Sequence, residues 1–306
     1  MTVVSTFDRP LGLPVVPGLD EDLPPRVSRR QRTWRQLRRS RLAIPGAAIV
    51  AVFLVAALGA PWLAPYEPAA NDLAAMMMLP SAAHPFGTDE LGRDILSRIL
   101  YGARLSILEG VFSVALAMLI GVPIGVISGY SGKMTDTIVM RLMDILLAFP
   151  GVLLAIVIVS ILGPSLVNAM IAVAIYTVPI FARVARASTL SVVAEPYIEA
   201  CRAIGMSHAR ILALHILPNV SAPLWVLATL RVAIAILTAS SLSFLGLGAQ
   251  APSPEWGAML ANGRNYMLIA PHVVIFPGLA IVLLVLGLNL FQDGLRLALD
   301  PKTTER

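Results

Sequence analysis

Two charged side chains, Glu109 and Arg231, lie inside long apolar stretches of this 306-residue sequence. A charge in a membrane interior costs about 3 kcal/mol unless it is paired or hydrated, so both residues are candidates for a functional site. Arg231 could bind an anionic group of a ligand or pair with a second subunit. Glu109 could bind a cationic group or lie at interface depth beside Arg104. Arg141 and Asp144 stand three residues apart on one helix face, which predicts a structural ion pair.

No combination of residues predicts catalysis or metal binding. The four histidines are scattered and lack a zinc-site spacing such as HExxH: His84, His208, His215 and His272. The sequence contains neither a GxSxG nucleophile motif nor the GxxxxGK[ST] loop of ATPases. A single cysteine, Cys201, excludes an internal disulfide. We therefore expect no catalytic residue, no metal and no cofactor in this chain.

The composition is typical of a membrane protein. Hydrophobic residues make up 57% of the chain and charged residues 13%, whereas soluble domains carry about 25% charged residues. The apolar residues form blocks of about 20, the length that a helix needs to cross a bilayer. The predicted fold class is an all-α membrane protein with six transmembrane helices: Leu42–Ala64, Leu105–Tyr130, Ile138–Leu162, Leu166–Arg183, Pro223–Leu245 and His272–Phe291.

Basic residues are distributed unequally between the two sides of the predicted membrane. Of the 23 Lys and Arg residues, 18 lie in segments on one side, four lie on the other side and Arg231 lies within a span. Because Lys and Arg favour the cytoplasmic side, both termini are predicted to be cytoplasmic. Residues 1–41 form a basic, proline-rich segment that would contact anionic lipid heads. Residues 65–104 are predicted to form an extracytoplasmic loop, and residues 105–295 are predicted to form the five-helix core. Residues 296–306 are predicted to form a cytoplasmic tail.

The inner loop, residues 184–222, predicts two short helices joined by a hinge. Pro196 suits the first position of a helix, and Gly205 suits the residue after its end. Ser207 can cap a second helix, which should end before Pro218 because the residue preceding proline disfavours helical geometry. A short helix that protrudes into water needs a partner to bury its apolar face, although it could also lie flat on the membrane.

The same loop resembles the EAA loop of bacterial ABC importer permeases. The matching residues are Glu199, Ala200, Cys201, Gly205, Leu217 and Pro218. Cys201 stands where the pattern has a second alanine, and His215 stands where the general pattern has isoleucine. His215 is instead similar to the peptide-importer branch. The resemblance implies that residues 196–206 form a coupling helix, which docks into a groove on a cytoplasmic ATPase.

Four further stretches resemble the C-type permease of dipeptide and oligopeptide importers of the peptide/nickel family. They are HPFGTDELGRD (84–94), DxxxMRLMDILLAFP (136–150), LSFLGLGAQAPSPEWGAML (242–260) and DGLRLALDP (293–301). The resemblance extends from about residue 40 to the end of the chain. It implies a type I ABC importer permease fold in the bacterial cytoplasmic membrane, as a multi-pass protein.

The resemblance also implies partners and a cargo. The partners are a homologous second permease, two ATPase subunits or domains that hold ATP and Mg²⁺, and an extracytoplasmic substrate-binding protein. The implied function is ATP-driven import of di- or oligopeptides, with Arg231 and Glu109 as candidates for the translocation path. Nickel, glutathione or another small solute is the alternative cargo, and no nucleic acid partner is expected.

Two rival classes fit the sequence less well. An ion-coupled secondary transporter usually shows internal repeats and paired interrupted helices, and neither is evident here. An intramembrane enzyme would need a nucleophile and a base within the spans. Six spans with one conspicuous cytoplasmic loop fit half of a two-subunit pore better.

Overall fold

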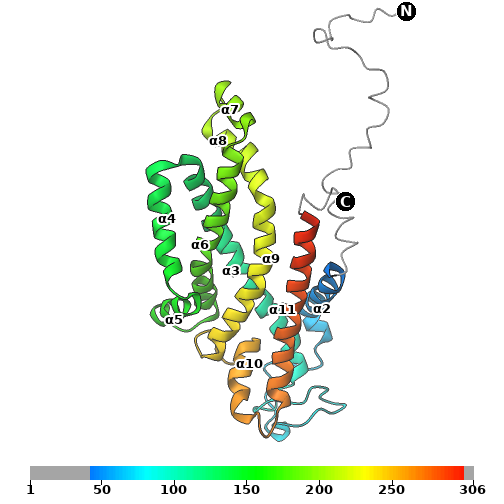
Figure 1. Cartoon of the computed structure of the whole chain (residues 1–306). Coiled ribbons are helices and arrows are strands. Elements are labelled where there is room, and N and C mark those ends of the chain that lie inside the picture. The colour runs from blue at the N-terminus through cyan, green and yellow to red at the C-terminus, as the bar shows by residue number, and fades with distance from the viewer. Residues whose placement is uncertain (1–41, 300–306) are drawn as a thin grey trace, which may run out of the picture.

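The computed structural model describes residues 42–299, and the long helices of this part run roughly side by side (Figure 1). Five helices are long and apolar enough to cross a membrane, and a bent pair brings the number to as many as six. The predicted N-terminal segment 1–41 lies outside the described residues. The helices are α2 (Ala43–Leu63), α3 (Ile95–Ser131), α4 (Lys133–Ala148), α5 (Gly151–Leu162), α6 (Leu166–Val193), α7 (Pro196–Ala203), α8 (His208–Ile211), α9 (Leu217–Phe244), α10 (Trp256–Gly263) and α11 (His272–Leu299).

Helices α3 and α6 pack closely because α3 presents small residues to α6. Gly121, Gly125 and Gly129 recur every four residues on that face of α3. A Cβ atom added to Gly125 would lie 2.1 Å from the backbone oxygen of Ala182, so the contact requires glycine. Small residues are typical of membrane helix interfaces, where close backbone approach replaces the hydrophobic effect as the source of attraction. Helices α2 and α11 pair on the other side of α9 (Figure 1).

The predicted third span, Ile138–Leu162, is not a straight helix. Helix α4 ends at Ala148, α5 begins at Gly151, and the two helices are bent by 89°. Pro150 explains the break, because a proline lacks the N–H that would continue the helix and disfavours helical geometry in the preceding residue. That residue, Phe149, accordingly has an extended backbone, with φ −85° and ψ 135°.

Two helices extend beyond the bounds of their predicted spans. Helix α3 begins inside the predicted outer loop 65–104, and the Asp94 side chain caps it by accepting the N–H of Ser97 at 2.8 Å. Helix α11 continues to Leu299, so the predicted tail 296–306 begins as helix. Hydropathy reports where the chain is apolar, whereas a helix continues as long as its backbone hydrogen bonds are made. Polar helix ends therefore project beyond the apolar blocks.

The inner loop 184–222 is also more helical than predicted. Helix α6 runs on to Val193, and from His208 the chain continues through α8, a π-helical turn (Leu212–Ile216) and α9. The second short helix, α8, does end before Pro218, but the chain does not leave helical geometry there. Pro218 lies in the first turn of α9, directly after the π turn. A proline is tolerated at that position because the first N–H groups of a helix need no intrahelical partner.

Candidate functional site: a protruding elbow

Helices α7 and α8 and the turn between them, residues 196–211, protrude at one end of the helix bundle (Figure 1). We call this segment the elbow. Gly205 forms the predicted turn, with a left-handed φ of 77° that favours glycine. The N–H of Gly205 donates to the carbonyl of Arg202 and the N–H of Met206 to that of Cys201, both at 3.0 Å. This pair of bonds closes the end of α7 and reverses the chain direction.

The elbow has an inner and an outer face. Ile198 and Ile211 are fully buried and join the apolar core of the bundle. Glu199 and Ala200 are exposed, and Ile204 at the tip is 78% exposed. An apolar tip with acidic and small residues beside it, at the end of a long projection, is a surface that a partner protein could cover.

His215 holds α7 against the start of α9. Its Nε2 lies 3.8 Å from Sγ of Cys201, and its ring centre lies 6.0 Å from that of Tyr197. Nδ2 of Asn219 donates to the His215 carbonyl at 2.6 Å and to the Tyr197 hydroxyl at 3.3 Å. The motif residues Leu217 and Pro218 are exposed in the first turn of α9. Sequence reasoning selected Cys201 and His215 but missed Tyr197 and Asn219.

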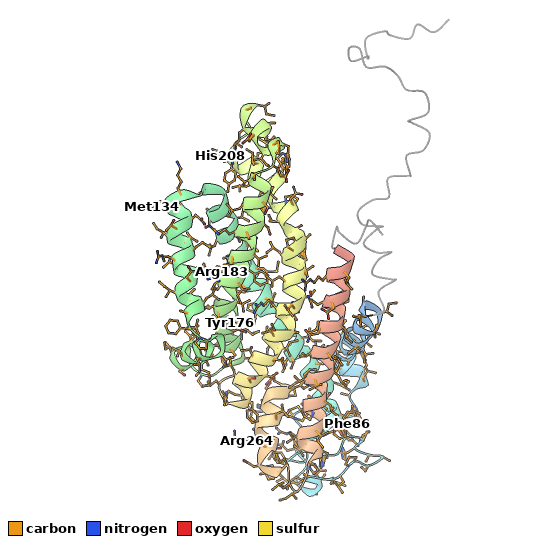
Figure 2. All side chains as sticks on the ribbon, in the orientation of Figure 1. Phe86, Met134, Tyr176, Arg183, His208 and Arg264 are labelled. Carbon is orange, nitrogen blue, oxygen red and sulfur yellow. The ribbon has the colours of Figure 1, made fainter. Side chains whose placement is uncertain are left out.

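A second contact joins the elbow to α3. The hydroxyl of Tyr130, in the last turn of α3, lies 2.6 Å from Nδ1 of His208, which Figure 2 labels near the elbow. The guanidinium of Arg202 lies 5.3 Å from the centre of the same tyrosine ring, a cation–π distance. These partners are far apart along the chain, so no local spacing could have revealed the contact. The elbow is therefore attached to α3 as well as to α6 and α9.

The predicted pairing of Asp144 with Arg141 is wrong. The partner of Asp144 is Arg183 of α6, with Nη2 at 2.6 Å from the carboxylate. Asp136 of α4 pairs in the same way with Arg186, one turn further along α6. An i,i+3 spacing places two side chains on one face of a helix, but a residue on a neighbouring helix can reach the same carboxylate. Both ion pairs hold α4 against α6.

Arg231 lies on α9 and is half-buried. Its Nε is buried and has no hydrogen-bond partner among residues 42–299. A guanidinium in a membrane span needs water or an anionic partner, and within the described part of the chain no carboxylate pairs with it. Arg231 therefore presents a charge that an anionic ligand group or a second subunit could neutralise.

Glu109 is fully buried inside the chain, whereas Arg104 is exposed. Both carboxylate oxygens of Glu109 lack a hydrogen-bond partner among the described residues. The hydroxyls of Ser106 and Ser113, about one turn to either side on α3, are likewise buried and unpartnered there. Packing of the chain itself therefore covers Glu109, whereas the neighbouring Arg104 faces outward. A role on the translocation path would require a conformation that uncovers Glu109.

Glu255 is a second fully buried carboxylate, and sequence reasoning missed it. Its oxygens accept the N–H groups of Gly257 and Ala258, both at 2.8 Å, and so cap α10. The hydroxyl of Ser240 on α9 donates to the same carboxylate at 3.3 Å. Burial raises the pKa of Glu255 above its ordinary value, while the two backbone N–H groups act in the opposite direction. Glu255 therefore fastens α10 to α9 and is a structural residue.

The apolar helices indicate a multi-pass membrane protein. Residues 121–305 match the family described as binding-protein-dependent transport system inner membrane component. Residues 28–81 match the N-terminal transmembrane domain of oligopeptide transport permease C. The chain belongs to this family: it is a C-type permease subunit of the peptide family of ABC importers, in the cytoplasmic membrane.

Two kinds of relatives cover nearly the whole chain. The dipeptide transport system permease protein DppC of Alkalihalophilus pseudofirmus is 50% identical over 282 residues, 92% of this chain and 93% of that protein. The glutathione transport system permease protein GsiD of Pectobacterium atrosepticum is 48% identical over 271 residues, 88% of this chain and 90% of that protein. GsiD of Escherichia coli O157:H7 is 49% identical over 271 residues, 88% and 89% of the two chains.

Among solved structures, the chain is similar to the MetNI methionine ABC transporter in inward-facing conformations. The TM-score is 0.53 with 21% sequence identity, and the match covers 65% of this chain and 95% of that chain. At this identity the likeness concerns the fold alone. It agrees with the predicted fold class, a type I ABC importer permease.

Proposed function

We propose that this chain conducts di- or oligopeptides across the cytoplasmic membrane and that partner ATPases drive it through the elbow. The observation that carries the proposal is the elbow itself, whose apolar tip, Ile204, is 78% exposed beyond the spans. The cargo assignment is supported by two kinds of relatives, named for a dipeptide and for glutathione, which is itself a tripeptide. Nickel or another small solute is the alternative cargo.

The proposed docking places the outer face of α7 in a groove of the ATPase. Ile204 fills an apolar pocket there, Ala200 allows close backbone approach, and Glu199 pairs with polar groups at the groove edge. ATP and Mg²⁺ bind to the ATPase subunits, and this chain supplies no catalytic residue. When the ATPases close, the motion of the elbow passes to α9 through His215 and to α3 through Tyr130.

The remaining partners follow from the same proposal. A homologous second permease completes the pore, and an extracytoplasmic binding protein delivers the peptide to the end opposite the elbow. Arg231 then either contacts the peptide or pairs with the second permease, because an unpaired guanidinium in a span needs an anionic or aqueous environment. The helices reorient a shared aqueous cavity from the outer to the inner side, and peptide leaves inward after hydrolysis.

The test is ATP hydrolysis and radiolabelled peptide uptake by the reconstituted complex, with and without Glu199→Lys. Glu195→Lys is the matched control, because Glu195 is also exposed and precedes α7, and no cap bond from its side chain would be lost. We expect ATP-dependent uptake that Glu199→Lys abolishes and Glu195→Lys largely retains. Uptake on an ion gradient without ATP would instead make the chain a secondary transporter, and equal effects of the two variants would place the docking surface elsewhere.

A further inference from the structure

A pocket of about 520 Å³ lies at the opposite end of the bundle from the elbow, near Arg264 in Figure 2. Three segments line it: residues 90–93 of the outer loop, residues 244–251 at and after the end of α9, and residues 261–266 at the end of α10. Its volume is within the range of about 300–1,000 Å³ that small-ligand pockets occupy. The distribution of basic residues places this end on the extracytoplasmic side.

One wall of the pocket carries a carboxylate on a rigid support. Arg93 is 2% exposed and binds two acids at once, with Nε at 2.7 Å from Asp89 and Nη2 at 3.0 Å from Oε1 of Glu90. Asp89 also pairs with Arg98, whose Nε lies 3.4 Å away, so two guanidinium groups balance the two carboxylates. Glu90 lines the pocket and keeps some exposure. It can therefore face a cationic group of a ligand.

Another wall carries a guanidinium without a partner acid. Arg264 is exposed and lines the pocket, with its guanidinium 5.7 Å from the centre of the Phe244 ring. Among residues 42–299, no carboxylate lies within ion-pair distance of Arg264. The contact with Phe244 places the charge over an aromatic face and leaves its N–H donors available. A carboxylate is the ligand that a guanidinium binds best, through two parallel hydrogen bonds.

The other lining residues suit a peptide backbone. Asn262 and Asn265 bring amide groups that can both donate to and accept from peptide bonds. Leu245 and Ala251 contribute apolar surface for a side chain. The partly exposed carboxylate of Glu90, the guanidinium of Arg264, the amides and the apolar surface together match the groups of a short peptide with free ends.

We propose that this pocket is an entry subsite for cargo, in which Arg264 binds the free carboxylate of a short peptide and Glu90 faces its ammonium group. The proposal rests on the proposed function, because it takes the cargo to be a peptide. It adds the site at which the peptide meets this chain before it enters the membrane. It also predicts that a peptide must have a free C-terminal carboxylate to bind in this pocket.

The test uses thiol labelling at Asn265→Cys in the reconstituted permease–ATPase complex without the binding protein. Leu268→Cys is the control, because Leu268 is 91% exposed and lies outside the pocket lining. The parent chain, labelled in parallel, gives the signal of Cys201, its one cysteine. We expect millimolar trialanine to slow labelling at position 265 several-fold and to leave position 268 unchanged.

Two comparisons test the chemistry. Trialanine amide lacks the carboxylate. We expect it to need at least a tenfold higher concentration than trialanine for the same protection of position 265, because one charged hydrogen-bonded contact is lost. Arg264→Ala, combined with Asn265→Cys, should reduce protection by trialanine to the level of the amide, and Arg264→Lys should restore part of it. If either the amide protects as well as trialanine or Arg264→Ala has no effect, the assigned role of Arg264 is wrong.

Parallel uptake measurements separate this inference from the proposed function. ATP-driven uptake of trialanine without any protection at position 265 would overturn the pocket and leave the peptide importer standing. Protection that appears only when the binding protein is added would make the pocket a protein docking surface and overturn the proposal. Uptake of nickel, with no peptide uptake and no protection, would overturn both.

Discussion

The hydroxyl of Tyr130 lies 2.6 Å from Nδ1 of His208, which joins the last turn of α3 to the first turn of α8. The elbow is continuous in sequence with α6 and α9, so motion can reach those helices through the chain itself. It reaches α3 indirectly through the packing of α6, and directly through side chains. Tyr130 provides the direct route, with Arg202 packed over its ring at 5.3 Å.

Tyr130→Phe should therefore reduce coupling without preventing assembly. The substitution removes the hydrogen bond to His208 and keeps the ring under Arg202, and a neutral hydrogen bond contributes about 1 kcal/mol. We expect peptide uptake per ATP hydrolysed to fall about fivefold, whereas Tyr130→Ala, which also removes the ring, lowers it further. Tyr66→Phe is the control, because it removes a similar hydrogen bond, to the Ala83 carbonyl, at the other end of the molecule. An unchanged ratio of uptake to hydrolysis in Tyr130→Ala would contradict the role of Tyr130.

Gly205→Pro should uncouple hydrolysis from uptake while the chain still inserts in the membrane. Proline fixes φ near −65°, whereas Gly205 has a φ of 77° and donates its N–H to Arg202. Gly205→Asn is the comparison, because asparagine tolerates the left-handed conformation and a Cβ there meets no atom within 4 Å. We expect uptake to be lost in the first variant and mostly kept in the second. Equal uptake by both variants in assembled complexes would show that the turn geometry does not matter.

Gly125→Ala should destabilise the chain, because the new Cβ would lie 2.1 Å from the backbone oxygen of Ala182. Overpacking a close helix contact costs about 1–3 kcal/mol, and we expect a lower thermal unfolding temperature of the purified protein. Gly278→Ala is the matched control, since its Cβ would meet only Leu260, at 3.8 Å. If the two alanine variants unfold at the same temperature, the α3–α6 contact is less close than described.

Glu109→Gln should leave peptide uptake nearly unchanged. Glu109 is fully buried within the chain. Glutamine has the same shape, so the substitution removes a carboxylate that no described residue pairs with and leaves the surface of the protein unchanged. We expect equal or higher thermal stability and uptake within about twofold of the parent, because a buried unpaired carboxylate disfavours the folded state. A loss of uptake greater than tenfold, in a complex of normal stability, would show that Glu109 becomes exposed to cargo during transport.

The elbow shows how far local sequence reasoning reaches. Gly205 and Pro196 were placed correctly because a left-handed turn and a helix start depend on the residue itself and its immediate neighbours. The same reasoning correctly ended the short helix before Pro218 but missed that the chain stays helical there. Whether a proline ends a helix or begins the next one depends on the preceding turn, and a π turn was not visible in the sequence. The block that contains Pro150 has the hydropathy of a single span, although its backbone bends sharply between α4 and α5.

The sequence by itself determined the membrane class, the approximate position of the spans and the turn at Gly205. These properties follow from composition, from the length of apolar blocks and from short-range backbone preferences. Only the tertiary structure decided that Asp144 pairs with Arg183, that Tyr130 meets His208 and that Glu109 is buried. The physical reason is that each of these depends on which helix faces pack together, and packing brings together residues whose separation along the chain carries no local signal.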